Sequence, residues 1–153
     1  RELGLASWPS PAGGCCFLTD ENYARKFRDL VSHTEDAADT LSHEDFLLLA
    51  VGRRFRLDER VVFVVGRDEG ENAALQRLAR GRWLLDAEGV PGPTALVLGE
   101  PDEAALRRVA AVVAGYGKGR ELAQVTVIAQ RAEQQVCLEV APERGATVDA
   151  LRV

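Results

Sequence analysis

The periodicity of apolar and polar positions changes near residue 53. Residues 54–57 alternate between arginine and apolar side chains, and an unbroken apolar run follows at 61–65. Alternation is typical of a strand with one buried face, and a short apolar run is typical of a fully buried strand. Similar patterns predict five further strands, at 83–85, 94–98, 124–130, 135–140 and 148–153.

Helical spacing of apolar residues predicts two short helices in the first third of the chain. Asp20 is a candidate N-cap for the first of them, and Ser42 is a candidate N-cap for the second, at 44–51. The apolar stripe of the first helix comprises Tyr23, Phe27, Leu30 and Val31.

Two longer helices are predicted further along. One spans 71–80, and the other begins with Pro101 at its first position and runs to Tyr116. Between them, Pro91 and Gly92 predict a tight turn, because glycine at the second central position accepts a positive φ.

This order of elements is not the repeated βα alternation of a doubly wound sheet. We therefore expect an α+β fold, with a mixed or antiparallel sheet and two main helices. Residues 1–19 are rich in Gly, Pro and Cys, which predicts an extended segment before the short helices. The predicted domain organisation is a lead-in segment at 1–52 and a domain at 53–153.

Composition and charge narrow the class of protein. The 153 residues are 46% hydrophobic, which excludes disorder of the whole chain, and no apolar run is long enough for a membrane span. The net charge of −5 argues against indiscriminate nucleic-acid binding. However, residues 29–45 hold six acids and no Lys or Arg, whereas 53–82 hold eight arginines and five acids. The arginines could form a basic face or could be scattered and solvated.

Catalytic and metal-binding patterns are scarce. The turn at 66–70 lacks the lysine and Ser/Thr of a P-loop, so an ordinary turn between strand and helix is the stronger interpretation. His33 and His43 could join Cys15 and Cys16 in a zinc site, but their spacing fits no usual pattern and favours solvated histidines. We expect neither a metal nor a cofactor in this chain, and it does not look like an enzyme on its own.

The three cysteines do not form the disulfide framework of a secreted domain, which favours a reducing cytoplasm. Cys137 falls in a predicted strand, where a buried thiol behaves as a small hydrophobe. Cys15 follows two glycines, and a thiolate on such a loop could carry sulfur as a persulfide. On the chemistry of the segment alone, a half-buried structural cysteine is the favoured interpretation of Cys15.

Residues 8–20 read Trp-Pro-Ser-Pro-Ala-Gly-Gly-Cys-Cys-Phe-Leu-Thr-Asp, and Tyr-Ala-Arg-Lys-Phe-Arg-Asp-Leu follows at 23–30. This block resembles the region just after the catalytic half of bacterial thiouridylase-like proteins. Those are relatives of the PP-loop ATP-pyrophosphatases that replace an oxygen of a tRNA base by sulfur. Cys15 occupies the family's cysteine position, whereas Cys16 stands where an aliphatic residue is expected. The resemblance implies a missing N-terminal half that carries the S-G-G-x-D-S loop and binds ATP and Mg.

A second block reads Val-Val-Gly-Arg-Asp-Glu-Gly-Glu-Asn-Ala-Ala-Leu at 64–75, Gly-Val-Pro-Gly-Pro-Thr at 89–94 and Tyr-Gly-Lys-Gly-Arg at 116–120. It resembles the RNA-binding domain of the NFACT proteins, which act in ribosome quality control. Asp68 replaces the family's usual Asn, Pro93 replaces a small polar residue, and the family's D-L-W-F-H phrase is lost.

Together the resemblances imply a cytoplasmic, tRNA-binding C-terminal domain of a tRNA thiolation enzyme, a 2-thiouridylase-like sulfurtransferase when complete. Its arginines would hold phosphates, and Cys15 would be the catalytic persulfide carrier. The implied partners are tRNA, the protein's own ATP-pyrophosphatase half and a sulfur carrier. The implied RNA contacts are Arg67, Asn72, Lys118 and Arg120, with Arg54 and Arg56 as support.

A different class of function stays open. The acidic stretch at 29–45 would attract the catalytic half or a basic sulfur carrier, which makes the chain a protein-docking module without RNA contact of its own. Residues 53–56 could likewise be an exposed strand edge protected by charge.

Overall fold

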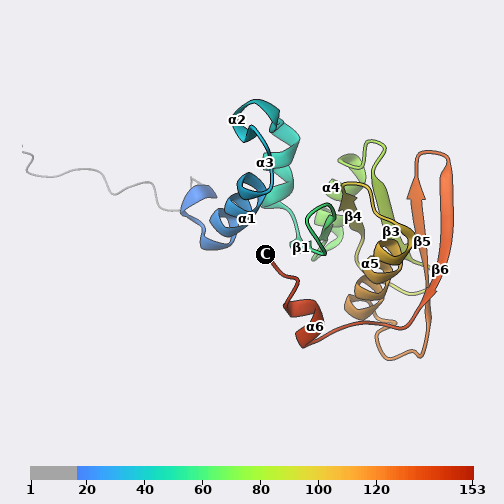
Figure 1. Ribbon diagram of the computed structural model, residues 1–153. Helices are drawn as coiled ribbons and strands as arrows, with labels where there is room; N and C mark the ends of the chain where they lie inside the picture. Colours follow the sequence, from blue (N-terminus) through green and yellow to red (C-terminus); the bar gives the residue numbers. More distant parts are fainter. Residues whose placement is uncertain (1–16) are drawn as a thin grey trace, which may run out of the picture.

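Backbone hydrogen bonds join the strands into one six-stranded sheet, in the order β1-β2-β4-β3-β5-β6 (Figure 1). This computed structural model describes residues 17–153, so the predicted extended segment with Cys15 and Cys16 lies outside the described residues. Each pair of neighbouring strands is antiparallel, which confirms the predicted α+β class. The strands are β1 (Arg53–Arg56), β2 (Val62–Val65), β3 (Trp83–Ala87), β4 (Ala95–Leu98), β5 (Val125–Arg131) and β6 (Gln134–Val140).

The four longest helices of the described chain each begin after a residue whose side chain accepts a hydrogen bond from a first-turn backbone N–H. Asp20 and Ser42 have this role, as predicted, and Asp102 caps the helix that was expected to start at Pro101. None of the described helices is long and apolar enough to span a membrane. The helical segments are η1 (Phe17–Thr19), α1 (Glu21–Ser32), α2 (Ala37–Thr40), α3 (His43–Ala50), α4 (Glu69–Arg77), α5 (Glu103–Tyr116) and α6 (Ala146–Asp149).

Helix α5 covers one face of the sheet and makes the larger core (Figure 1). Its apolar side chains pack against inward-facing strand residues such as Phe63 and Val127, which are fully buried. Burial of each such side chain contributes about 1.5–3 kcal/mol to folding. The buried stripe of α5 includes Leu106, Val109, Ala110 and Val113.

A second, smaller core lies on the opposite face of the sheet. There Leu75 of α4 packs with Val64, Leu84 and Leu96 of the strands. Leu48 of α3 belongs to the same cluster and is completely buried. The lead-in helices are therefore attached to the sheet by a core residue as well as by the chain.

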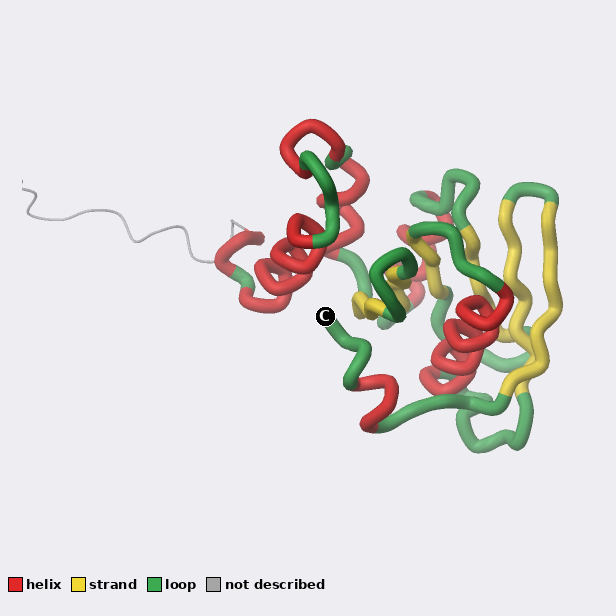
Figure 2. The backbone as a smooth tube through the Cα atoms, in the orientation of Figure 1, coloured by secondary structure: helices red, strands yellow, loops and turns green. Residues whose placement is uncertain are grey.

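The lead-in helices α1, α2 and α3 gather beyond the β1 edge of the sheet, and the long β5–β6 hairpin forms the opposite end (Figure 2). The last residues return to β1, where Val153 N–H donates to the carbonyl of Arg54 at 3.1 Å. Three segments distant in sequence thus meet at this edge: α1, β1 and the final residues.

The predicted strand at 148–153 is wrong. Residues there form α6 and then a single antiparallel bridge between Phe55 and Arg152. Gly145 turns the chain with a φ of 83°, and the helical turn that follows inserts Val148 into the larger core. Only the residues beyond that turn are left to pair with β1.

Two smaller predictions also fail. The positive φ expected at Gly92 occurs instead at Gly89, with a φ of 70°, so 91–92 is not the predicted tight turn. Cys137 is exposed rather than buried, because β6 is an edge strand and its neighbour Leu138 takes the inward position.

Candidate nucleic-acid interface

The turn between β2 and α4 is organised by its own acids. Asp68 caps α4 by accepting from the N–H of Glu71 at 2.9 Å, and Glu71 in turn accepts from the backbone N–H of Arg67 at 2.7 Å. The Arg67 guanidinium also bonds to both oxygens of Glu71. These hydrogen bonds lower the pKa of Glu71 to about 2, although partial burial raises it. Arg67 is thus held in place, yet its side chain stays about half exposed.

Asn72 ties this turn to the loop that precedes β4. Its Oδ1 accepts from the N–H of Thr94 at 3.0 Å, and Gly66 N–H donates to the Thr94 carbonyl at 3.0 Å. A Cβ on residue 66 would lie 2.1 Å from Asn72 Oδ1, so glycine is required there by close approach. Thr94 is buried, and its hydroxyl donates to Asp86 at 2.6 Å. The Oδ1 of Asn72, predicted to face RNA, is therefore engaged within the fold.

The end of α5 joins the same loop. Lys118 N–H donates to the carbonyl of Pro91 at 2.8 Å, and a Cβ on Gly117 would lie 3.4 Å from the Cα of Gly92. The Lys118 side chain is exposed. Within residues 17–153, the Lys118 ammonium group forms no ion pair.

One groove of about 720 Å³ unites these three segments. It is lined by the β2–α4 turn, the 91–93 loop and the end of α5, which are the three segments of the second sequence block. Four of the predicted contact residues line it: Arg67, Asn72, Lys118 and Arg120.

Sequence reasoning missed two further residues of the groove, Arg53 and Tyr116. The Arg53 guanidinium carbon lies 5.1 Å from the centre of the Tyr116 ring, which packs at a tilt against Phe55. The signal for Tyr116 was its place at the head of the 116–120 segment. Arg53 could not be told apart from the neighbouring arginines by the strand pattern alone.

Charge in the groove is mixed. Four basic residues face three acidic ones, and Arg120 has an ion pair with Glu121 at 3.7 Å. Such a surface can hold an anionic chain at a few points, with an aromatic ring beside them. The basic residues are Arg53, Arg67, Lys118 and Arg120, and the acidic ones are Asp68, Glu69 and Glu121.

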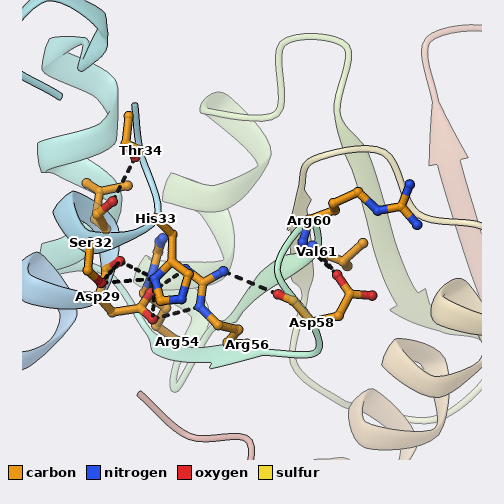
Figure 3. A network of polar contacts seen from close by, with 10 residues as sticks. Asp29, Ser32, His33, Thr34, Arg54, Arg56, Asp58, Arg60 and Val61 are labelled. Carbon is orange, nitrogen blue, oxygen red and sulfur yellow. Dashed lines mark hydrogen bonds and ion pairs between the residues drawn. The ribbon is translucent and has the colours of Figure 1, made fainter. Parts of the chain in front are cut away.

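Arg54 and Arg56 do not line this groove; they point to Asp29 of α1 (Figure 3). Arg56 makes two hydrogen bonds to the carboxylate, each of 2.7 Å, and the Nε of Arg54 lies 3.5 Å from it. Burial raises the pKa of Asp29, but the hydrogen bonds of Arg56 and the charges of both arginines have the larger effect, so the pKa lies below its ordinary value. Only 3% of Arg54 is exposed, so its predicted support of RNA would require it to act from inside the fold.

The acidic stretch and the arginine-rich segment meet a second time at Glu44 of α3. Arg80 forms an ion pair with Glu44, and Arg82 lies 3.6 Å from the same carboxylate. The two opposite charge excesses of the sequence are thus partly paired with each other across the lead-in helices. Glu35, Asp36 and Asp39 remain exposed.

Residues 17–153 contain no cluster of three or more His, Cys, Asp or Glu side chains that could hold a metal ion. The turn at 66–70 does not fit a nucleotide phosphate, because it has no lysine and because Asp68 already accepts from an N–H at the start of α4.

Comparisons with known proteins identify a similar fold and a family. The C-terminal part of the fibronectin/fibrinogen-binding protein from Streptococcus suis has a similar fold, with a TM-score of 0.59 at 18% identity. The match covers 67% of this chain and 49% of that one, so the chain spans about half the length of that structure. No curated protein matches the chain. The model of the family described as the NFACT protein RNA binding domain matches residues 52–150, and the chain therefore belongs to that family.

Proposed function

We propose that this domain binds RNA through the groove between the β2–α4 turn and the end of α5. The observation that carries the proposal is the convergence of all three segments of the NFACT-like block on one groove. Family membership supports the choice of RNA as the ligand. Lys118 is the strongest candidate contact, since its exposed ammonium group is not paired within the described residues.

The chemistry of the groove suggests how it would act. Lys118, Arg120 and Arg67 would contact phosphates, and the Tyr116 ring beside Arg53 would offer an aromatic surface. Because the whole chain carries a net charge of −5, binding would depend on this local set of cations and weaken steeply with salt.

We further propose that the RNA is tRNA and that the chain is the C-terminal part of a cytoplasmic thiouridylase-like enzyme. The support is the resemblance of residues 8–20 to the segment after the catalytic half of those enzymes. The N-terminal half would then supply the ATP and Mg site, and the domain would orient tRNA. Cys15 would carry the sulfur as a persulfide, and a sulfur carrier would be a further partner.

Binding of labelled bulk tRNA to the chain tests the first proposal, at salt concentrations of about 50 and 200 mM. We expect binding at the lower concentration and a loss of roughly tenfold in affinity for Lys118→Ala. The salt slope should fall by roughly 0.7–0.9 in the same variant. Arg60→Ala is the control, because Arg60 is exposed and lies outside the groove.

The absence of tRNA binding at low salt would contradict the proposal and favour the protein-docking function. Equal effects of Lys118→Ala and Arg60→Ala would show that binding does not use the groove. For the thiolation role, Cys15→Ser in the full-length enzyme should abolish sulfur insertion, whereas Cys16→Ser should retain it. Retained activity of Cys15→Ser would rule out the persulfide role.

A further inference from the structure

A smaller pocket, which shares Arg53 and Arg67 with the groove, lies where α1, the start of β1 and the final residues meet. Its volume is about 70 Å³, and a site needs roughly 10–15 Å³ by the same measure to hold one water molecule. Six of its lining residues are basic and no lining side chain is acidic. The basic residues are Arg25, Lys26, Arg53, Arg54, Arg67 and Arg152.

This positive charge is only partly neutralised by the fold. Asp29 is the acid beside Arg54, but it shares its carboxylate with Arg56, and Arg54 Nε is buried without a hydrogen-bond acceptor among the described residues. Glu71 is already bonded to Arg67. Of the six cations, only Arg54 and Arg67 have an ion pair with a side-chain carboxylate among the described residues.

Lys26 shows the effect of this excess. It is 91% buried, and its ammonium group donates to the carbonyls of Leu49 at 3.1 Å and Gly52 at 2.8 Å. Burial and then repulsion by Arg67 and Arg54 lower the pKa of Lys26 to about 8. An anion in the pocket would relieve that repulsion.

Arg67 connects the pocket to the RNA groove, because its side chain lines both. Arg53 also lines both, and on the groove side it lies against Tyr116. We propose that the pocket lined by Lys26, Arg54 and Arg152 binds one phosphate group, and that this is a phosphate of RNA lying in the groove. The second half of this inference rests on the proposed function; the first half does not.

The test follows the amide signals of Gly52 and Arg53 by NMR in the 1–153 chain while inorganic phosphate replaces chloride at constant ionic strength. We expect saturable shifts of these signals. Arg152→Ala should lower the affinity for phosphate by about tenfold, and Arg25→Ala should lower it as well. Arg28→Ala is the matched control, since Arg28 is an exposed arginine of α1 that does not line the pocket.

An oligonucleotide that carries internal but no terminal phosphates then identifies the source. Displacement of inorganic phosphate by this RNA supports the full inference. Displacement only by an oligonucleotide with a 5′-phosphate restricts the pocket to an RNA end and also supports it. RNA that binds the groove without displacing phosphate would overturn the RNA assignment and leave a site for free phosphate.

The remaining outcomes separate the two proposals. Phosphate binding in a chain that binds no RNA would sustain the phosphate pocket and refute the proposed function. If neither phosphate nor RNA shifts the Gly52 and Arg53 signals, the pocket is not a phosphate site. The same conclusion follows if Arg28→Ala weakens phosphate binding as much as Arg152→Ala does.

Discussion

Gly66 and Asn72 depend on each other, because the side chain of Asn72 occupies the space that a Cβ on residue 66 would need. The Asn72 amide lies over Gly66 and holds the buried N–H of Thr94. This gives a physical reason for a glycine and an asparagine six residues apart in the 64–75 block. Their role is to fix the β2–α4 turn against the 91–94 loop.

We expect Gly66→Ala to destabilise the fold by about 1–3 kcal/mol, because the new methyl group displaces Asn72 and leaves the Thr94 N–H unpaired. Urea unfolding measures this loss. Gly92→Ala is the control, since a Cβ there meets only ordinary contacts at 3.5 Å. Asn72→Ala added to Gly66→Ala should cost little more; a fully additive loss would argue against the coupling.

Lys26 gives the molecule a pH dependence in the alkaline range. Its pKa is about 8 in the folded chain, lowered by burial and by Arg67, Arg54 and Arg152 against the opposing pull of Glu71, and 10.5 is its ordinary value. Between these values the unfolded chain binds more protons, so the free energy of unfolding should rise with pH, by about 3 kcal/mol at most. Below about pH 8, Lys26 is protonated in both the folded and the unfolded chain, so it adds no pH dependence to the free energy of unfolding.

Chemical unfolding in phosphate-free buffer at a series of pH values from about 7 to 10.5 measures this rise. The variant Lys26→Met should lack the component, because nothing titrates at that position. Identical slopes for the two proteins would show that the Lys26 ammonium group is not penalised by its surroundings.

At the scale of elements, the contact between α1 and β1 depends on one carboxylate. Asp29 accepts two hydrogen bonds from Arg56 and lies beside the buried Arg54. Removal of one partner from a buried ion pair leaves the other charge uncompensated, which costs more than the pair contributes.

Asp29→Asn should therefore lower the free energy of unfolding by about 3 kcal/mol at neutral pH. Asp39→Asn, in the exposed part of the same acidic stretch, should have little effect. Because the pKa of Asp29 is lowered, its contribution is complete above about pH 3.8 and is lost as the pH falls through the folded value. Equal unfolding curves for both variants would contradict the structural role of Asp29.

At the scale of the whole molecule, the lead-in helices and the sheet share a core. Leu48 of α3 is fully buried among strand residues, and Asp29 of α1 pairs with β1. The predicted boundary lies between residues 52 and 53, and the family match begins at residue 52; these contacts cross that boundary.

A chain that begins at residue 53 should consequently melt at a temperature lower by more than about 10 °C than the 1–153 chain. Leu48→Ala, which removes a single core contact from the intact chain, should give a smaller decrease of the same sign. Equal melting temperatures for the long and short chains would show that 53–153 is an independent domain. Thermal unfolding followed by circular dichroism distinguishes these results.

Local chemistry made much of the fold predictable. The alternation around Phe55, the caps Asp20 and Ser42, and the stripe of α5 are short-range patterns, and each produced the expected element. The sequence also identified four of the residues that line the groove, because they belong to segments of a recognisable block. It could not indicate that Asn72 would be engaged with Thr94, 22 residues away.

By itself, then, the sequence determined most of the strands and helices and the family resemblance, because hydrophobic period and capping act over a few residues. Only the tertiary structure decided which arginines face solvent. Arg53, Arg54 and Arg56 look alike in a strand, but Arg53 lies against Tyr116 in the groove, whereas Arg54 and Arg56 turn to Asp29 on α1. The same holds for α6, which forms because Val148 reaches the core. Such outcomes depend on residues far apart in the chain, and packing alone brings those residues together.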